Sequence, residues 1–462
     1  MKTTFKRQDR GKNFKYWLVF LLLTAVLVPS VWLLVSRMEG DAPGIDLEIE
    51  SRHIRTQSVI PVHVSDAKSG IRNVRAVLIK DGSEFVLMET GNDEIDSPGK
   101  RIDFVLSIDT KTMGLTDGKA LLRIEAVDRS WRNWLSGNRT QVEKEFLIDT
   151  TVPRITVLSR QHNVTRGGAG LVIYRLSELC EKHGIAVGDD FFPGHPGNFP
   201  DKELYIAFFA LRHDQGPGTD LHVEAVDPAG NMGRSGFYHY IRDKRFAAET
   251  LPISDAFLRR ILPSFPPGAD IKPDVTPVEH FLYINRELRN QNNATILANG
   301  RSTDETMHWE HEFLRLPNSA PKAAFADHRT YSYNGETIDQ AYHLGIDLAS
   351  VQQAPVPAAN KGRVAFIDHI GIYGLTAIID HGFGLFSIYS HLSRTEANPG
   401  DLIGKGDILG YTGTTGLAGG DHLHYGIFID HVFVNPVEWW DPAWIKNNVT
   451  DKLEDAKVSS GG

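Results

Sequence analysis

Residues 421–429 read Asp-His-Leu-His-Tyr-Gly-Ile-Phe-Ile. Apolar side chains at every second position from Leu423 to Ile429 predict a packed β-strand. Because successive side chains of a strand point to opposite faces, His422 and His424 share the other face. The pattern therefore predicts a strand that presents two imidazoles at one point, where one can bind a metal while its neighbour points at the same water.

Two more histidine-containing segments accompany this strand. One reads His343-Leu-Gly-Ile-Asp347, and the other has His391 between Ser and Leu. Gly345 and the β-branched Ile346 favour a strand and turn over a helix, and a bent strand can aim both polar side chains at one point. Two imidazoles and one carboxylate can hold Zn²⁺ and leave a fourth position for water, which is typical of a catalytic zinc site. Two further imidazoles then remain to move protons.

These segments resemble the LytM/lysostaphin-like (M23) zinc metallopeptidases. The resemblance runs from about Tyr331 to Trp440 and consists of short blocks in the family's order. A lone His-x-His occurs often by chance, whereas several spaced blocks in one order are specific. The matching blocks are residues 343–347, 354–358, 361–364, 378–382, 389–393, 404–410, 412–416, 422–424 and 434–436.

Carried over to this sequence, the family pattern implies that His343, Asp347 and His424 bind one Zn²⁺. It also implies that His391 and His422 are the catalytic histidines. The implied activity is a peptidoglycan endopeptidase, which cuts peptide cross-links of the bacterial wall through a metal-activated water. Either catalytic histidine fits the general base by position, so this choice stays open.

The departures from the family pattern are small. Asp421 stands where Gly or Pro is common, and Tyr425 stands where Phe is usual. Neither change removes a ligand, whereas some family members have lost ligands and activate other enzymes. The donor that would stabilise the oxyanion is open, with three candidates near the first ligand: Tyr331, Tyr333 and Tyr342.

Length and composition bound the alternatives. The chain has 462 residues, which predicts about three domains, and 41% hydrophobic residues, which allows ordinary globular cores. A net charge of −9 argues against a general nucleic-acid binder. The single cysteine, Cys180, forbids an intrachain disulfide and is expected to be an inert thiol.

Residues 16–36 form an uncharged apolar run that is long enough to cross a bilayer as a helix. The preceding residues 1–15 are rich in Lys and Arg, so the positive-inside rule predicts a cytoplasmic basic tail and an extracytoplasmic or periplasmic remainder. A cleaved signal peptide is the alternative. The run is long for such a peptide and no clear cleavage site follows, so we expect a single-pass inner-membrane anchor.

Short alternating runs separated by turn signals predict a β-sandwich over residues 41–149 and a second β-sandwich-like unit over residues 150–244. The sequence Ile124-Glu-Ala-Val-Asp128 recurs as Val223-Glu-Ala-Val-Asp227, each followed closely by an Asn. This echo resembles the end of bacterial immunoglobulin-like domains. The units would serve as a passive spacer or as a wall-contacting stalk.

Residues 245–318 predict a mainly helical linker. Ser254 is a candidate N-cap, and Thr276-Pro-Val-Glu279 is a capping box with Pro at the first helical position. The helices could pack on the peptidase and cover its cleft. Residues 319–445 would form the peptidase domain, and residues 446–462 a polar tail with a frayed end.

The sequence thus predicts a mainly β protein behind one transmembrane helix. Its expected partners are peptidoglycan, the inner membrane and, as a further possibility, envelope or division-complex proteins, but not nucleic acid. Three alternatives remain open: a non-cutting peptidoglycan-binding or amidase-activating protein, a peptidase for Gly-rich or other peptides, and a structural tether with a vestigial peptidase.

Overall fold

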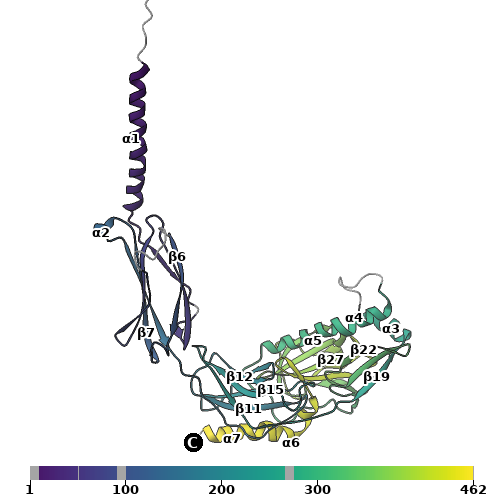
Figure 1. Cartoon of the computed structure of the whole chain (residues 1–462). Coiled ribbons are helices and arrows are strands. Elements are labelled where there is room, and N and C mark those ends of the chain that lie inside the picture. Colours follow the sequence, from purple (N-terminus) through teal and green to yellow (C-terminus); the bar gives the residue numbers. More distant parts are fainter. Residues whose placement is uncertain (1–9, 50, 91–99, 266–274, 461–462) are drawn as a thin grey trace, which may run out of the picture. The chain divides into compact units, whose positions relative to one another are not determined.

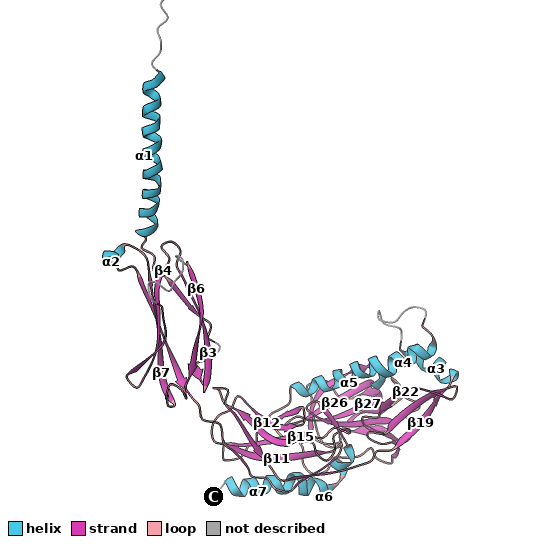
Figure 2. Cartoon of the chain, in the orientation of Figure 1, coloured by secondary structure: helices cyan, strands magenta, loops and turns pink. Residues whose placement is uncertain are grey.

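The computed structural model describes residues 10–49, 51–90, 100–265 and 275–460. The chain divides into two compact units (Figure 1). The first unit comprises residues 1–152 and 228–231, and the second comprises residues 153–227 and 232–462. Most described elements are strands, which confirms the predicted mainly β fold (Figure 2).

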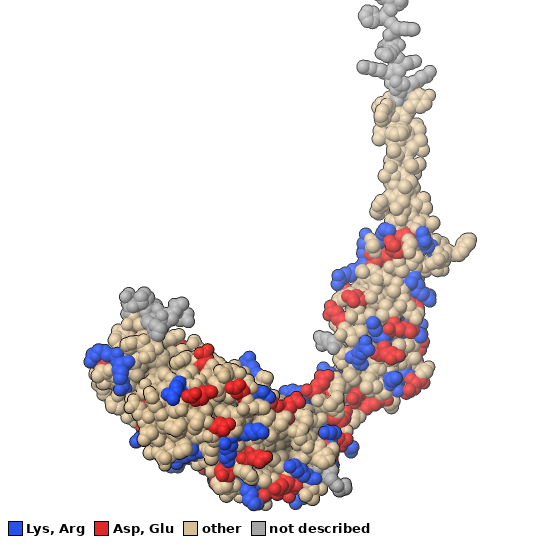
Figure 3. Space-filling model, turned by 180° about the vertical axis from the view of Figure 1, so that it is seen from behind, with Lys and Arg blue, Asp and Glu red and all other residues tan. Residues whose placement is uncertain are grey.

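The N-terminal helix α1 spans Arg10–Arg37. Its stretch Phe14–Arg37 is 24 residues long and is apolar enough to cross a membrane by length and composition. Figure 3 shows this helix as a mostly uncharged surface, whereas positive and negative side chains mix over the rest of the face in view. The finding supports a membrane anchor or signal at this end of the chain. Of the predicted basic tail at residues 1–15, residues 1–9 lie outside the described residues, and residues 10–15 belong to α1.

The rest of the first unit consists of two β-sheets around one core. Inward-facing residues recur at every second position, as in Val62 and Val64 of one sheet and Leu122 and Ile124 of the other. This two-layer arrangement agrees with the predicted sandwich, while its immunoglobulin-like character stays a prediction. One sheet has the order β1 (Gly44–Leu47), β3 (Gln57–Ser65), β6 (Arg101–Asp109), and the other β2 (His53–Ile54), β8 (Arg139–Ile148), β7 (Gly118–Asp128), β4 (Ile71–Lys80), β5 (Ser83–Glu89). A short helix α2 (Arg132–Leu135) lies between β7 and β8.

The second unit begins with two four-stranded sheets and a parallel pair. The first sheet has the strand order β14 (His195–Pro196), β15 (Leu204–Ala210), β11 (Ala169–Leu176), β9 (Ile155–Val157). The second has the order β13 (Asp190–Pro193), β12 (Lys182–Val187), β16 (Leu221–Val226), β17 (Met232–Gly236). The parallel pair consists of β10 (His162–Thr165) and β18 (His239–Arg242).

This β-rich segment shares a core with the C-terminal region. The ring of Phe208 from β15 lies 6.3 Å from that of Trp309 and 6.0 Å from that of Trp439. The two tryptophan rings are 5.5 Å apart, and all three side chains are buried. Residues 153–227 are therefore packed onto the peptidase region by aromatic contacts and do not form a free spacer.

The C-terminal region is built on a ten-stranded sheet. Its central order β23–β30–β27–β26–β25 places three histidine-bearing segments next to one another. The strands are β20 (Ala320–Ala323), β23 (Ile346–Ala349), β24 (Pro355–Pro357), β25 (Gly362–Ile370), β26 (Gly374–Gly382), β27 (Leu385–Thr395), β28 (Leu402–Ile403), β29 (Ile408–Thr412), β30 (Leu423–Ile429) and β31 (Val432–Val434).

The region preceding this sheet is partly helical, with both predicted caps confirmed. Ser254 caps α3 (Asp255–Ile261), and Thr276 forms the capping box of α4 (Pro277–Tyr283). A π-helical turn continues α4 into α5 (Arg289–Leu297). The Pro-rich segment between α3 and α4 lies mostly outside the described residues.

Two segments differ from the prediction. Ala248–Ile253 is not helical but forms strand β19, which pairs in parallel with β21 (His328–Tyr333) and joins β22 (Glu336–Tyr342) in a three-stranded sheet. This strand depends on a partner edge about 80 residues away, which local patterning does not reveal. The C-terminal segment was predicted as a polar tail, but α6 (Pro442–Ile445) and α7 (Asp451–Ser460) are helices. They pack because Val449 and Ala456 are buried.

Candidate metal centre

Adjacent strands bring the predicted ligands together. Asp347 on β23 pairs directly with His424 on β30, and Ser390 on β27 pairs with His424 from the other side. His343 lies in the turn before β23, as the strand-and-turn interpretation predicted. The cross-strand register therefore converts distant sequence positions into one site.

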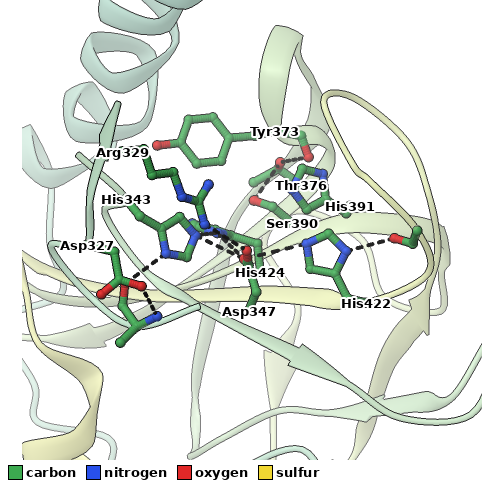
Figure 4. A network of polar contacts seen from close by, with 12 residues as sticks. Asp327, Arg329, His343, Asp347, Tyr373, Thr376, Ser390, His391, His422 and His424 are labelled. Atoms are coloured by element: carbon green, nitrogen blue, oxygen red, sulfur yellow. Dashed lines mark hydrogen bonds and ion pairs between the residues drawn. The ribbon is translucent and has the colours of Figure 1, made fainter. Parts of the chain in front are cut away.

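His343, Asp347 and His424, here called the histidine cluster, converge through one atom each (Figure 4). Nε2 of His343 lies 3.0 Å from Oδ1 of Asp347 and 3.0 Å from Nδ1 of His424. Nδ1 of His424 lies 2.9 Å from the same carboxylate oxygen. Two nitrogens and one oxygen thus face one point, and this donor set fits a borderline-soft divalent cation. The group can hold a metal ion.

Hydrogen bonds on the far side of the rings fix which nitrogen faces the site. Nδ1 of His343 donates to the carbonyl of Ala324 at 2.9 Å, because a carbonyl can only accept. The lone pair of Nε2 is then directed to the metal position. Such outer contacts orient metal-ligating imidazoles.

The two predicted catalytic histidines lie beside the cluster with the same tautomer. Nδ1 of His391 donates to Thr415 O and Nδ1 of His422 donates to Gly420 O, both at 2.8 Å. Their ring centroids are 4.7 Å apart, and Nε2 of His422 lies 3.5 Å from Oδ1 of Asp347. Each ring therefore turns its Nε2 away from the backbone and toward the site. Burial alone would lower the pKa of His422, but the adjacent Asp347 carboxylate raises it, so His422 is protonated more readily than His391.

Burial and neighbouring charges set the protonation of these groups. Burial, together with the neighbouring His422 and His424, lowers the pKa of His391 to about 3. Burial also lowers the pKa of His424 to about 4. Burial alone would raise the pKa of Asp347, but the surrounding His343, His422 and His424 hold it well below its usual range. At pKa values this low, the imidazoles of His391 and His424 are neutral at pH 7. A neutral ring is required for proton acceptance by His391 and for metal binding by His424.

Two features of the backbone help to position the side chains of the site. His391 has a φ of +61°, in the left-handed region that non-glycine residues rarely adopt, so the strand is locally strained at a candidate catalytic residue. At Gly345, an added Cβ would lie 2.5 Å from Nε2 of His424. Glycine is needed there because the ligand ring packs against the backbone.

Arg329, which the sequence analysis did not anticipate, contacts the carboxylate of Asp347 in the histidine cluster. Its Nη2 lies 3.5 Å from Oδ2 of Asp347, the carboxylate oxygen that does not face the two imidazoles. Its Nε lies 3.2 Å from Oε1 of Glu249, its register partner on β19. No signal within the sequence marks this contact, because it depends on the pairing of β19 with β21.

The site lies in a cleft of about 330 Å³. Residues of β19, α3, α4 and α5 line it, so the segment before the sheet forms part of its wall, and the hypothesis that this segment covers the cleft stays a prediction. Of the three tyrosines considered as oxyanion donors, Tyr331 lines this cleft, whereas Tyr333 bonds Asp255 at 2.7 Å and Tyr342 is 44% exposed.

Tyr373 also lines the cleft and was missed by the sequence analysis. Its ring lies 5.4 Å from that of His424. Helix α5 holds it in place, because Asn293 accepts its hydroxyl at 2.7 Å and Asn292 accepts the backbone N–H of Ile372 at 2.8 Å. Burial raises the pKa of Tyr373 to about 12, so it remains a proton donor.

Other histidines take no part in this site. His381 is fully buried and bonds Lys361 O at 2.8 Å and Ser387 Oγ at 2.7 Å. His308 bonds Asp304 at 2.8 Å, and His369 is exposed. The free thiol of Cys180 is buried, and burial raises its pKa to about 11, in line with an inert residue.

Comparison with known proteins assigns the class. Residues 341–436 match the family model "Peptidase family M23". "DD-carboxypeptidase/endopeptidase Mpg" of Neisseria meningitidis is 40% identical over 95 residues, covering 21% of this chain and 22% of that protein. "Peptidoglycan DD-endopeptidase ShyA" of Vibrio cholerae is 32% identical over 89 residues, covering 19% of this chain and 21% of that protein.

A crystal structure of a putative M23 peptidase from Pseudomonas aeruginosa covers 62% of this chain and 95% of its own, at 19% identity and a TM-score of 0.38. The chain spans about a fifth of the length of the curated relatives it matches. Within that part, residues 341–436 carry a peptidase M23 domain.

Proposed function

We propose that this protein is a membrane-anchored zinc endopeptidase that hydrolyses the peptide cross-links of bacterial peptidoglycan. In this proposal α1 anchors the chain in the inner membrane, with the basic N-terminal residues in the cytoplasm and the second unit outside. The observation that carries the proposal is the histidine cluster with the two further imidazoles of His391 and His422 at one cleft.

We assign the metal to Nε2 of His343, Oδ1 of Asp347 and Nδ1 of His424. When bound there, Zn²⁺ would polarise the scissile carbonyl and lower the pKa of a water molecule. Arg329 holds the second oxygen of the ligand carboxylate, which favours binding through one oxygen and leaves room at the metal position.

His391 and His422 move the protons in this proposal. Nε2 of one ring accepts the proton of the attacking water, and the proton is later delivered to the leaving amine. Tyr331 or Tyr373, which both line the cleft, would donate to the oxygen on which negative charge develops, and Tyr373 would do so by exchanging its hydrogen bond to Asn293.

The cleft also suits a substrate that carries carboxylates. Arg289 and Lys322 line it together with Arg329. The peptides of the bacterial wall carry free carboxylates, and positive side chains in a partly dry cleft attract and orient such groups.

The test is digestion of purified peptidoglycan by the full chain in detergent micelles, with products identified by mass spectrometry. We expect new peptide termini with the wild type and none with His424→Ala. His369→Ala is the matched control, since it removes an exposed imidazole from the same domain and should cut like the wild type. Wall binding without cleavage by a chain that holds one zinc would overturn the proposal in favour of a binding or amidase-activating role.

A further inference from the structure

A second group of convergent ligands lies in the first unit, outside the peptidase region. Glu39, Asp66 and Asp128, here called the acidic cluster, offer oxygen atoms that all lie within 4.8 Å of one another. Their exposed fractions are 4%, 6% and 0%. Glu39 lies two residues after the end of α1 at Arg37, while Asp66 follows β3 and Asp128 ends β7.

Positive charge does not compensate this group within the described residues. No described Lys or Arg forms an ion pair with any of its three carboxylates, and the nearby cations bond elsewhere. Arg37 donates to Arg129 O at 3.1 Å, Arg129 to Ile71 O at 3.1 Å, Arg132 to Met38 O at 3.3 Å, and Lys68 to Asp41 Oδ2 at 3.1 Å. Burying three carboxylates side by side without a counter-charge is costly, and a bound cation would offset that cost.

Unpartnered oxygens point to a bound cation. Oε1 of Glu39 accepts the N–H of Ser69, but its buried Oε2 has no hydrogen-bond partner among the described residues. Oγ of Ser69, a residue that is 4% exposed, also has none in that part of the chain. Buried acceptors left unpaired beside other carboxylates are the oxygens that a cation would bind.

Backbone and amide donors hold the other carboxylates in fixed positions. Oδ1 of Asp66 accepts the N–H of Gly70 at 2.6 Å. Asp128 accepts Ser130 N at 2.9 Å through Oδ1 and Asn138 Nδ2 at 2.7 Å through Oδ2. The oxygens are therefore pre-oriented, which lowers the ordering cost of ligand binding.

We propose that the acidic cluster binds one hard divalent cation, with Ca²⁺ as the best fit. The donors are all oxygens, which excludes the soft and imidazole-preferring metals. A dry cage of protein oxygens suits Ca²⁺ more than Mg²⁺, because Mg²⁺ keeps several of its waters. This proposal is independent of the peptidase activity.

The cation would fasten the chain leaving α1 to the sandwich. The same segment is already bonded to the β7–β8 connection, since Ser130 Oγ donates to Arg37 O at 3.2 Å and Asn138 Nδ2 donates to Glu39 O at 3.3 Å. A cation that bridges Glu39 to Asp66 and Asp128 adds a charge-based link across the same junction, which stiffens the exit from α1.

The test is calorimetric titration of the zinc-loaded full chain in detergent micelles with Ca²⁺ and, separately, Mg²⁺. We expect one Ca²⁺ per chain with a dissociation constant of about 1 mM or tighter. Glu39→Gln and Asp66→Asn, which keep the side-chain shape, should each weaken Ca²⁺ binding at least about tenfold. Asp41→Asn is the matched control, because it removes an exposed carboxylate from the same linker and should bind like the wild type.

A second readout covers variants that fold poorly. Saturating Ca²⁺ should raise the unfolding temperature of the wild type's first unit, since a ligand that binds only the folded state stabilises it. The proposal is overturned if the wild type binds no Ca²⁺ at about 1 mM and shows no thermal shift. It is also overturned if Asp41→Asn loses binding as strongly as the two cluster variants, because general surface charge would then explain the signal.

Discussion

The histidine cluster of the peptidase sheet and the acidic cluster of the first sandwich are alike in size and burial, but their donor atoms differ. Two imidazole nitrogens and one carboxylate oxygen converge in the first, and carboxylate oxygens alone converge in the second. The first has two more imidazoles beside it in a cleft, whereas the second faces only backbone and amide donors. The comparison teaches that the type of donor atom selects the cation. It also teaches that a metal site needs neighbouring proton-transferring groups for catalysis, whereas a site without them can only stabilise the structure.

Glu438, elsewhere in the chain, has a carboxyl group that forms no ion pair among the described residues. Oε2 of Glu438 accepts the N–H of Ala169 at 3.0 Å, and its carboxylate packs against Gly168, where a Cβ would lie 2.4 Å from Oε1. Burial raises the pKa of Glu438 to about 7, so this carboxyl is accommodated by protonation.

We expect the largest effect from a substitution that disables the histidine cluster and leaves the acidic cluster intact. His424→Ala should lower peptidoglycan hydrolysis by a factor of about 10³ or more, because it removes a ligand on which the chemistry depends. Calcium binding at the acidic cluster should be unchanged. Product release by mass spectrometry and calcium titration on the same preparation measure both. Loss of calcium binding in this variant would show that the clusters are not independent.

We expect the next largest effect from selective removal of each metal, which should distinguish the roles of the two clusters. A zinc-selective chelator should reduce hydrolysis by at least about 10²-fold, and added Zn²⁺ should restore it. A calcium-selective chelator should leave hydrolysis of soluble wall fragments intact and lower the unfolding temperature of the first unit. Both are measured on the full chain, by product release and by scanning calorimetry. Equal loss of hydrolysis with both chelators would contradict separate roles.

The carboxyl of Glu438 should make the free energy of unfolding depend on pH. The folded-state pKa of Glu438 lies above its ordinary value of 4.5, so its contribution to stability is fully present below about pH 4.5 and is lost as pH rises through about 7. Relative to Glu438→Gln, the wild type should lose on the order of 3 kcal/mol over that range. Denaturant unfolding of both proteins at several pH values measures this difference. A difference that does not vary with pH would mean that the carboxyl is ionised in the folded state.

The smallest expected effect concerns the support of one ligand. Arg329→Met should weaken zinc affinity by about 10–100-fold, because it frees the second oxygen of Asp347. Chelator competition measures the affinity, and the spectrum of the cobalt-substituted protein reports any change in coordination. Arg329→Lys keeps the charge and should recover part of the affinity. An unchanged affinity in Arg329→Met with a changed stability would limit Arg329 to a structural role.

Local patterning predicted the elements that depend on nearby residues. The alternation from Leu423 to Ile429 became β30, and the capping residues Ser254 and Thr276 begin α3 and α4. Strand periodicity and capping act over a few residues, so they are readable from sequence. Strand β19 was not, because its partner lies far along the chain and an isolated stretch carries no record of that pairing.

The amino-acid sequence by itself determined the ligand types and their spacing, the apolar helix at the N-terminal end and the mainly β fold, because these follow from residue chemistry and short-range periodicity. Only the tertiary structure decided which side chains support them. Arg329 reaches Asp347, α5 holds Tyr373 beside His424, and the acidic cluster assembles from three distant segments. Such contacts are set by strand register and packing between remote parts of the chain, where sequence distance carries no information about distance in space.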